Sequence, residues 1–523
     1  MHEIELKFQV PAAQRAAVDR AVAGRTGLGR KLQRRVRLQA AYFDTAQRAL
    51  AKARLALRVR REGHHWVQTL KGDTADGMTR LEHNVVLVHR PGATAEPPQA
   101  DPALHAGTPV GDRLFAALGR STDGTTARDR IASEPMAALY FTDILRRTRA
   151  QRSALGSVEL AFDTGSITAG GATLAVRELE IELLGGSPLA VLDAARRWLP
   201  RFGLWLDVRS KAERGDMLAR GEAVAPPRLA AAVSLTPKMS GSHALRCVLA
   251  SCTDQVIGNA SQITSGEHTD EHVHQLRIGL RRLRTALQLF DGPADPVPAG
   301  TASLAAAAAM LFRRLGAARD QVVIEAGFAA DLQAALQAAG VSGAGPRATA
   351  SSTEDAPDKV LREVASQGLL LDLLAATQAA SPAVTLAAPV AEPDLRRQLS
   401  ARLNRWHRRA AADAKRYRKL DDAGRHRLRK QVKRLRYALE FSAALFPRRA
   451  VRRYLAALRA AQERLGAIND VVVATEAFKR SRDADPRAWF ALGWLVARRE
   501  VLIAQAVPDL KKFASAKRFW KGG

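Results

Sequence analysis

The sequence predicts an α+β multidomain protein with a β-rich N-terminal part and an all-α C-terminal part. Short segments that alternate between apolar and polar residues, which are typical of strands, occur up to about residue 220. From about residue 240 the chain consists of long stretches rich in Ala, Leu and Arg with helical spacing. A chain of 523 residues is also too long for one hydrophobic core, so we expect at least two domains.

The basic excess of the chain is large and unevenly distributed. The formal net charge is +29, of which residues 1–225 carry +9 and the remainder carries +20. Such an excess indicates a polyanionic partner. Aromatic residues make up only 5% of the chain and are not interleaved with the bases, so phosphate chains are favoured as the partner over nucleic acid.

The hydropathy of the chain argues against a membrane protein. No run approaches the roughly 20 apolar residues that a membrane-spanning helix needs. The N-terminus carries Glu3 and Glu5 where a signal peptide would carry bases and then an apolar stretch. We therefore expect a cytoplasmic protein without membrane contact.

Individual elements follow from the same patterns. Strands are expected at residues 3–10, 53–61, 66–71, 80–88, 158–162 and 174–184, and a helix at 187–198. The proline-rich stretch 91–109 is expected to be a loop, and Pro226, Pro227 and Pro237 mark a linker. These features predict a first domain at 1–222, a linker at 223–240 and a helical domain at 241–523.

Charged residues occupy every second position in several of the expected strands. Glu3, Glu5 and Lys7 share one face, and 178–182 repeats this pattern with three glutamates. Arg58 and Arg60 do the same with bases. One such strand would be explained by a solvated face, but like charges in several strands repel unless counter-charges separate them. A closed barrel with these faces inward would set a divalent metal against one wall and phosphate oxygens against the other.

The same residues carry a resemblance to a known family. Glu3-Ile4-Glu5-Leu6-Lys7 resembles the E-x-E-x-K signature of the CYTH domain. Further matches follow in the family's order: Tyr42-Phe43-Asp44-Thr45, Leu57-Arg58-Val59-Arg60, Thr69-Leu70-Lys71, Arg80-Leu81-Glu82-His83-Asn84, Thr142-Asp143 with Arg146, 159–163, 178–182, and Ser210-Lys211 with Arg214-Gly215. The resemblance covers about residues 1–220 and implies an eight-stranded antiparallel tunnel barrel that holds a linear triphosphate. The last elements most resemble the bacterial inorganic triphosphatases.

The resemblance also implies roles for individual residues. The expected phosphate ligands are Lys7, Arg58, Arg60, Lys71, Arg80, Arg146 and Lys211. The expected ligands of one or two Mg²⁺ or Mn²⁺ ions are Glu3, Glu5, Glu82, Asp163, Glu178, Glu180 and Glu182. Among these sets, Glu5, Lys7, Glu180 and Lys211 are the expected catalytic residues. The implied activity is metal-dependent hydrolysis of inorganic triphosphate, with other short polyphosphates or organic triphosphates as further substrates.

The helical part contains an internal repeat. His274-Gln275-Leu276-Arg277 and 281–284 match His426-Arg427-Leu428-Arg429 and 433–436, while 315–320 matches 465–470. The offsets of 152 and 150 residues predict two pseudo-symmetric helical bundles at about 241–337 and 395–515, with a flexible insertion at about 338–358. Asp320 and Asp470 close the second motif, where we expect them to orient arginines.

Basic residues of the repeated motif share a helix face in each copy. Either copy alone would be explained by a solvated face, whereas two matching copies favour an anion-binding groove. The motifs resemble the CHAD domain over about residues 240–520, which implies binding of inorganic polyphosphate and leaves association with polyphosphate granules as a finer expectation. The expected ligands are His274, Arg277, Arg281, Arg282, Arg284, His426, Arg429, Lys433, Arg434 and Arg436.

Two other functions remain open at this point. The same barrel chemistry would suit an adenylate cyclase of class IV type, but the sequence has no clear nucleoside pocket. A non-catalytic polyphosphate-binding or targeting protein is the second alternative. A vestigial barrel should have lost charged positions, and these are present, so the sequence favours catalysis.

Overall fold

The computed structural model describes most of the chain. The described residues are 2–24, 33–63, 65–73, 78–87, 96–119, 136–291, 301–341, 343, 345–346, 356–378 and 395–520. The side chains of residues 317–326 lie outside this set, and the role predicted for Asp320 lies outside it with them. Most of the predicted insertion at 338–358 also lies outside the described residues.

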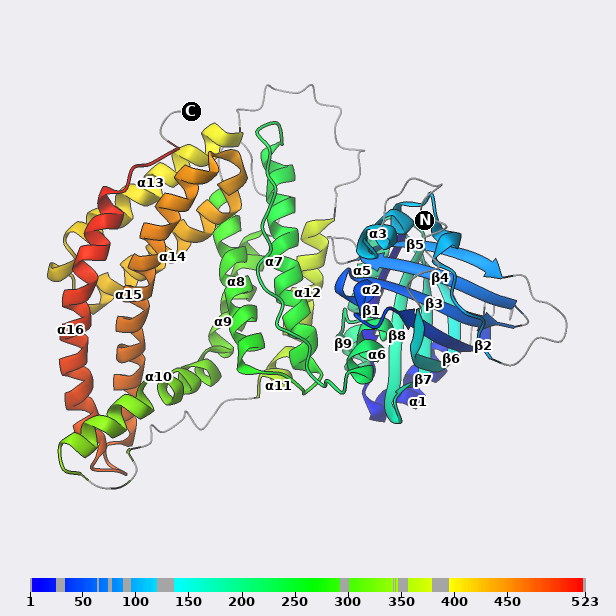
Figure 1. The fold of residues 1–523 in the computed structure, drawn as a ribbon, viewed down its shortest axis with the longest axis horizontal. Coiled ribbons are helices and arrows are strands. Elements are labelled where there is room, and N and C mark those ends of the chain that lie inside the picture. Colours follow the sequence, from blue (N-terminus) through cyan, green and yellow to red (C-terminus); the bar gives the residue numbers. More distant parts are fainter. Residues whose placement is uncertain are drawn as a thin grey trace. The chain divides into compact units, whose positions relative to one another are not determined.

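Within its described residues, the N-terminal part contains nine strands and several short helices (Figure 1). The strands are β1 His2–Gln9, β2 Gln33–Asp44, β3 Leu55–Glu62, β4 His65–Asp73, β5 Thr79–Leu87, β6 Ala137–Ser153, β7 Gly156–Ala169, β8 Ala172–Gly186 and β9 Trp205–Leu206. The α-helices are α1 Arg15–Ala23, α2 Ala49–Lys52, α3 Pro109–Ala117, α5 Leu189–Phe202 and α6 Lys211–Ala219, and two 3₁₀ turns are η1 Ala12–Gln14 and η3 Pro102–His105.

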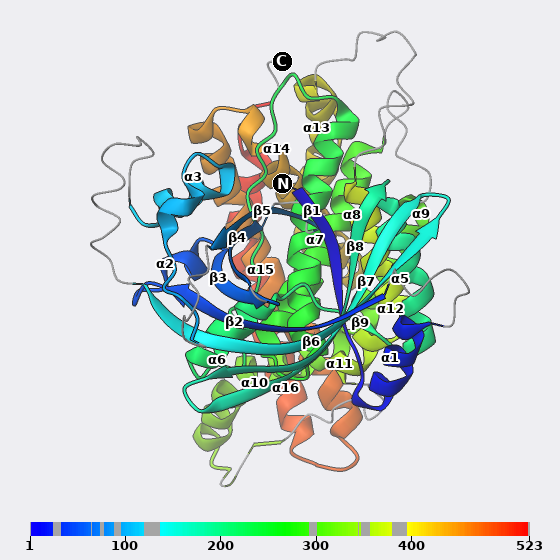
Figure 2. The ribbon, with the colours of Figure 1, turned by 90° about the vertical axis from the view of Figure 1, so that its right-hand side faces the viewer.

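Strands β1 to β8 form a closed antiparallel barrel. Their order is β5-β4-β3-β2-β6-β7-β8-β1, and pairing of β1 with β5 joins the two ends of the sheet. Figure 2 shows these strands curving round into a ring. Strand β1 closes the ring with its two halves: Glu3 pairs with Arg80 of β5, and Lys7 pairs with Glu180 of β8. The predicted eight-stranded barrel is confirmed.

The period of two sorts β1, β3 and β8 into a charged inner face and an apolar outer face. On β3, Leu57 and Val59 are fully buried in an outer cluster that includes Leu114 of α3, so Arg58 and Arg60 face the lumen. On the opposite wall, helix α5 contacts the outer face of β7 and β8. Apolar packing of the outer face therefore fixes which side chains point inward.

Helix α6 packs against the inner face instead. It contacts β6, β7 and β8, and a Cβ at Gly215 would lie 2.2 Å from a ring carbon of the lumen residue Tyr140. Only glycine allows this close approach, which brings the first turn of α6, and Lys211 within it, into the lumen.

The prediction of a loop over 91–109 is wrong for residues 102–105, which form η3, and for Pro109, where α3 begins. Residues 91–95 lie outside the described residues. Asp101 and Thr108 accept hydrogen bonds as N-caps from Ala103 and Gly111, and a proline follows each cap. Proline in the first turn is compatible with a helix, because the N–H that it lacks has no helical partner there.

Residues 222–240 contain no helix or strand, and most of the described chain after them is helical. The α-helices are α7 Gly241–Thr264, α8 Asp270–Phe290, α9 Thr301–Arg314, α10 Gly316–Ala338, α11 Pro357–Arg362, α12 Val364–Thr377, α13 Leu395–Lys415, α14 Asp422–Ser442, α15 Arg448–Ser481 and α16 Ala488–Ser515, and the 3₁₀ turns are η5 Tyr417–Lys419 and η6 Ala443–Leu445. Helices α13 to α16 form a four-helix bundle in which α13 contacts α14 and α16, and α15 contacts α14 and α16. The predicted fold class, a barrel followed by an all-α part, is confirmed.

The two copies of the repeat differ in one respect. Helices α8 and α14, which carry the basic motif, are both 21 residues long. The second motif lies inside the continuous α15, whereas its first copy spans the break between α9 and α10 at Leu315.

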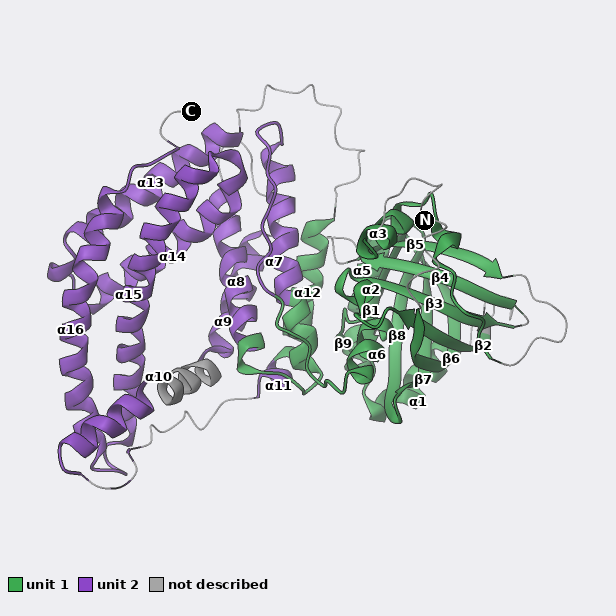
Figure 3. Cartoon of the chain, viewed as in Figure 1, with its two compact units in different colours: residues 1–228, 257–272, 361–381 green, residues 229–256, 273–360, 382–523 purple. Residues whose placement is uncertain are grey.

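The chain divides into two compact units, and neither unit is one continuous segment of the sequence (Figure 3). Unit 1 comprises 1–228, 257–272 and 361–381, so it holds the barrel together with two helical segments. Unit 2 comprises 229–256, 273–360 and 382–523. Within the described residues, no helix is both long enough and apolar enough to cross a bilayer.

Candidate active site in the barrel

Three carboxylates meet on the inner face of β7 and β8. Asp163 pairs directly with Glu178, and Glu180 lies two residues further along β8 on the same face. Each offers an oxygen within 4.8 Å of the others, and all three are buried. Within the described residues, they are the only such group of His, Cys, Asp and Glu side chains.

Bases of α6 and β6 neutralise this trio. Lys211 Nζ lies 2.8 Å from carboxylate oxygens of both Asp163 and Glu180 and also contacts Glu178. The guanidinium of Arg146 binds Asp163 with two hydrogen bonds of 2.7 Å and also contacts Glu180. Although burial opposes ionisation, Arg146 and Lys211 hold the pKa of Glu180 well below its ordinary value.

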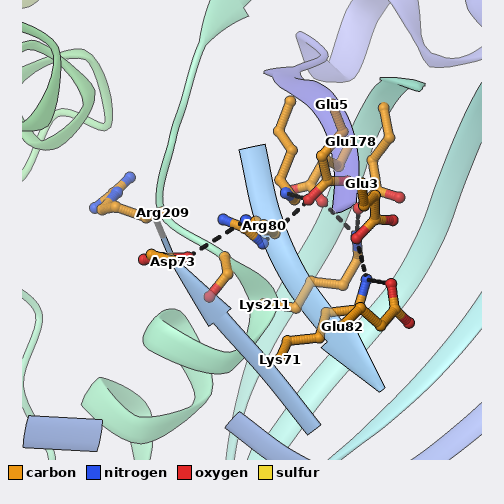
Figure 4. Close-up of polar contacts among 12 residues, drawn as sticks. Glu3, Glu5, Lys71, Asp73, Arg80, Glu82, Glu178, Arg209 and Lys211 are labelled. Carbon is orange, nitrogen blue, oxygen red and sulfur yellow. Dashed lines mark hydrogen bonds and ion pairs between the residues drawn. The ribbon is translucent and has the colours of Figure 1, made fainter. Parts of the chain in front are cut away.

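A second group of charges lies where β1 meets β5 (Figure 4). Glu5 contacts Lys7 and forms an ion pair with Arg80, with 3.1 Å between Arg80 Nη1 and Glu5 Oε1. Burial alone would raise the pKa of Glu5, but Lys7 and Arg80 lower it to about 2. Lys71 bridges Glu3 at 2.6 Å and Glu82 at 3.1 Å, and holds the pKa of Glu82 at about 2 against the effect of burial.

Glu182 stands out among the lumen carboxylates. Burial, together with the charges of Glu3 and Glu5, raises its pKa to about 7, and burial and Glu5 also raise the pKa of Glu3. Burial is thus the first cause of both raised pKa values, and repulsion from the neighbouring carboxylates adds to it. A cation bound there would relieve that repulsion.

Glu182 gives a pH dependence of stability that can be tested. Its pKa of about 7 in the folded protein exceeds its ordinary value of 4.5, so the folded state keeps a proton that the unfolded state loses in this window. The stability that Glu182 contributes should therefore be lost as pH rises from 4.5 to 7. In chelator, Glu182→Gln should flatten this fall and raise Tm at pH 8 by about 2–4 °C. The exposed Glu222→Gln is the control, and parallel Tm–pH curves for wild type and Glu182→Gln would contradict the assignment.

The bases of β3 form the wall opposite the carboxylates. Arg58 lies 3.5 Å from the hydroxyl of Tyr42, and Arg60 donates to Glu62 at 2.8 Å. Burial and the neighbouring Arg58 lower the pKa of Arg60, with Arg146 adding to the effect. Concentrated positive charge of this kind is stabilised by an anion.

The lumen contains two further residues that are missing from the predicted set of site residues. Arg214, one helical turn after Lys211, contacts Glu178 and is buried. Tyr42 stacks on Tyr140 with ring centroids 4.7 Å apart and faces Arg58. Both lie in matched motifs, Ser-Lys-x-x-Arg-Gly and Tyr-Phe-Asp-Thr, so their motif membership was the signal that could have found them.

The donor set fits a hard divalent cation. The converging ligand atoms of Asp163, Glu178 and Glu180 are all carboxylate oxygens, which Mg²⁺ and Mn²⁺ prefer. Glu3, Glu5 and Glu182 offer further carboxylate oxygens on β1 and β8, and burial together with neighbouring carboxylates raises the pKa values of Glu3 and Glu182.

In unit 2, the basic motifs of α8 and α14 lie near each other. Arg434 of α14 donates to Gln288 of α8 at 3.4 Å, so the two helices that carry the motifs are in contact. Burial and the charges of Arg281 and Arg429 lower the pKa of Lys433 to about 6. Arg277 and Arg281 lie over the ring of Phe312 at 4.7 and 5.1 Å, and Arg277 donates to the carbonyl of Gly316. His274 and Arg284 are half-buried, and His426 is exposed.

The other basic residues of the two motifs, His274, Arg277, Arg281 and Arg284 on α8 and His426, Arg429, Lys433 and Arg436 on α14, are called the basic row below. Two of the predicted polyphosphate ligands lie away from this row. Arg282 is buried, donates to Gln255 at 2.8 Å and lies over the ring of Phe441. Arg434 lies over the ring of Trp406 at 4.5 Å. Each follows a row residue by one position, which turns its side chain by about 100° around the helix.

The fold and the charged lumen define a tunnel barrel joined to a helical region. Residues 1–215 match the CYTH domain family and residues 247–479 match the CHAD domain family. The chain is therefore a protein with a CYTH domain followed by a CHAD domain, which confirms the resemblance drawn from its motifs.

Individual relatives give a narrower comparison. An inorganic triphosphatase from Haemophilus influenzae is 26% identical over 180 residues, which cover 34% of this chain and 44% of that protein. The chain thus aligns with less than half the length of this relative. The CHAD domain of the plant Ricinus communis is 29% identical with a TM-score of 0.42, covering 56% of this chain and 98% of that one. A putative adenylyl cyclase from Hippeastrum, described as having dominant triphosphatase activity, is 18% identical with a TM-score of 0.27, covering 42% and 96%.

Proposed function

We propose that the barrel hydrolyses inorganic triphosphate with Mg²⁺ or Mn²⁺ as cofactor. The observation that carries this proposal is the pairing of a carboxylate row with a wall of bases inside one closed barrel. The carboxylates suit a divalent cation, and the bases suit the oxygens of a short, linear polyanion. The matched CYTH domain and its relationship to an inorganic triphosphatase support the same activity.

Each group of lumen residues receives a distinct role in this proposal. Lys7, Lys211 and the arginines of the lumen bind phosphate oxygens and stabilise the charge that develops as the phosphoanhydride bond breaks. Glu5, Glu180 and their neighbours hold the cation. When bound, the cation would screen the phosphate charge and lower the pKa of a water molecule. The proposed catalytic residues are Glu5, Lys7, Glu180 and Lys211.

A substrate panel tests the proposed reaction. Phosphate release should be measured from triphosphate, ATP, thiamine triphosphate and long polyphosphate, each with Mg²⁺ and with Mn²⁺. We expect kcat/KM for triphosphate to exceed that for ATP by about tenfold or more, because no residue has been identified that would bind the nucleoside. Cyclic AMP formed from ATP would instead support a cyclase, and no turnover of any compound would support a non-catalytic polyphosphate-binding protein.

We further propose that the basic row of unit 2 binds inorganic polyphosphate. The row consists of His274, Arg277, Arg281 and Arg284 on α8 and of His426, Arg429, Lys433 and Arg436 on α14. The lowered pKa of Lys433 supports the proposal, because a bound polyanion would remove the repulsion that its arginine neighbours impose. Arg282 and Arg434 are left out of the row, since their contacts are internal. A cytoplasmic location near polyphosphate granules would suit this partner.

The polyphosphate proposal predicts a steep salt dependence in the full-length protein. Binding releases counterions, so log Kd should rise linearly with log salt concentration. Joint replacement of His274, Arg277, Arg281 and Arg284 by alanine should weaken binding about tenfold or more and reduce the slope by roughly 0.7 for each lost phosphate contact. Joint replacement of the exposed Arg448, Arg449, Arg452 and Arg453 is the matched control. Equal effects of both sets, or equal affinity for duplex DNA and RNA of matched charge, would leave only a generic basic surface.

A further inference from the structure

The turn that leads into Lys211 is held between the barrel and the helical segments of unit 1. Strand β9 pairs with β1, where Leu206 lies opposite Phe8, and Asp207 N–H donates to the carbonyl of Lys7 at 3.0 Å. Ser210 then caps α6, and Lys211 is the first residue of that helix. Four residues after β9 therefore separate a barrel edge from the lysine that contacts the carboxylate trio.

Helical side chains cover the second edge of β9. Leu206 N–H donates to Gln367 of α12 at 2.8 Å, and Val208 N–H donates to Ser261 of α7 at 3.1 Å. Gln367 is fully buried and in turn donates to the carbonyl of Leu361, which fixes the orientation of its amide. An edge strand without a neighbouring strand leaves its N–H groups unpaired, and these two side chains satisfy them.

A third helical side chain holds the residue between β9 and the cap. Arg209 binds Asp207 with hydrogen bonds of 2.9 and 2.8 Å and donates its remaining arm to Gln262 at 3.0 Å. Gln262 is almost fully buried and also donates to the carbonyl of Glu267 at 2.5 Å. The buried Asp207 and Gln262 thus hold the guanidinium from two sides.

These helical residues come from a part of the chain outside the CYTH match. Ser261, Gln262 and Gln367 lie within 247–479, the range that matches the CHAD domain, but they group with the barrel in unit 1 (Figure 3). The main chain from Leu206 to Ser210 has barrel contacts on one side and helical contacts on the other.

We infer that Ser261, Gln262 and Gln367 are positioning residues that set the place of Lys211 in the active site, so that triphosphate hydrolysis depends on helical segments of the CHAD range. This inference rests on the proposed function of the barrel. Lys211 contacts three carboxylates at once, and an error of about 1 Å at such a site can cost about 10²-fold in rate. The three side chains hydrogen-bond Leu206, Val208 and Arg209 of the turn, so their effect on Lys211 passes through the turn.

The test uses the full-length protein and replaces the contacts one at a time. Gln262→Leu and Ser261→Ala should each lower kcat for triphosphate about tenfold and change KM by less than about threefold, because phosphate ligands on the barrel strands stay in place. Ser261→Thr keeps the hydroxyl acceptor and should retain most of kcat. Hydrogen–deuterium exchange of residues 204–211 should accelerate in Gln262→Leu and Ser261→Ala and not in Ser261→Thr.

Gln255→Leu is the matched control. Gln255 is a buried glutamine on the same helix whose hydrogen bonds go to Gln275 and Arg282, so its loss should lower Tm without lowering kcat. Equal losses of kcat in Gln255→Leu and Gln262→Leu would overturn the inference, as would unchanged exchange of 204–211 in Gln262→Leu and Ser261→Ala. A wild type that turns over no triphosphate would overturn the proposed function alone, and the exchange rates would still decide whether the helical segments hold the turn.

Discussion

Replacing Lys211 by alanine is expected to lower kcat/KM for triphosphate by about 10²–10³-fold, the cost of removing one donor that stabilises developing charge in other enzymes. Lys211 is buried, and burial alone would lower its pKa, yet Asp163, Glu178 and Glu180 raise it, so it is charged throughout the working pH range. A phosphate chain in the lumen would meet this ammonium directly at the carboxylate trio. Phosphate release under saturating and limiting triphosphate measures the loss in kcat and in KM separately.

The same change should also affect stability, and this effect separates two interpretations. Removal of Lys211 leaves the trio with fewer compensating bases, so Tm should fall in chelator. A divalent cation should recover much of this fall, because it can replace the missing charge. Lys52→Ala, at an exposed lysine of α2, is the control and should change neither rate nor Tm. Wild-type turnover in Lys211→Ala would show that the lysine only balances charge.

The sequence predicted the barrel well where its two faces differ in polarity. In β1, β3 and β8 charged residues alternate with residues such as Leu57 and Ile181, which are fully buried on the outer face. The pattern gave no strand at β2 or β6. In β6 the lumen residue Arg146 is followed by Arg147, which pairs with Asp19 of α1 outside the barrel. With charges on both faces, the period of two disappears from the hydropathy pattern.

Helix geometry explains why Arg282 and Arg434 lie away from the basic row. A run of consecutive bases such as 281–284 looks uniform in sequence, but neighbours on a helix point about 100° apart. Arg281 therefore lies over the ring of Phe312, while Arg282 contacts Gln255 and Phe441 on another side of the helix. Matching the runs by spacing of three and four residues alone would have excluded the second residue of each run.

The contacts of unit 1 could not be predicted from the sequence. Gln367 lies 161 residues after Leu206, and its hydrogen bond to that residue depends on how α12 packs against α5 and β9. No local pattern marks a buried glutamine as the partner of an edge strand. The division of labour between a catalytic barrel and a binding domain, which the two domain matches suggest, is therefore too simple for the residues around Lys211.

The metal requirement has the largest expected effect. Excess chelator should reduce triphosphate hydrolysis by at least about 10³-fold, because a bound cation supplies charge stabilisation worth several kcal/mol. Addition of Mg²⁺ or Mn²⁺ should restore the rate. The motive is the carboxylate row, in which Glu182 and Glu3 have raised pKa values while the trio offers three oxygens within 4.8 Å. Undiminished hydrolysis in excess chelator would remove the metal from the proposed function.

Glu180→Gln and Glu5→Gln connect that requirement to individual side chains. Each change keeps the shape of the side chain and removes one negative charge, so turnover should fall by about 10²-fold and half-maximal activity should require more cation. The loss of an ion-pair partner should also lower Tm, but each variant should remain folded at the assay temperature. Glu222→Gln, an exposed carboxylate outside the lumen, should leave both quantities unchanged. Glu180 contacts Lys211 and Arg146, whereas Glu5 contacts Lys7 and Arg80. A shift of the cation requirement in only one of the two variants would therefore locate the ion at that end of the carboxylate row.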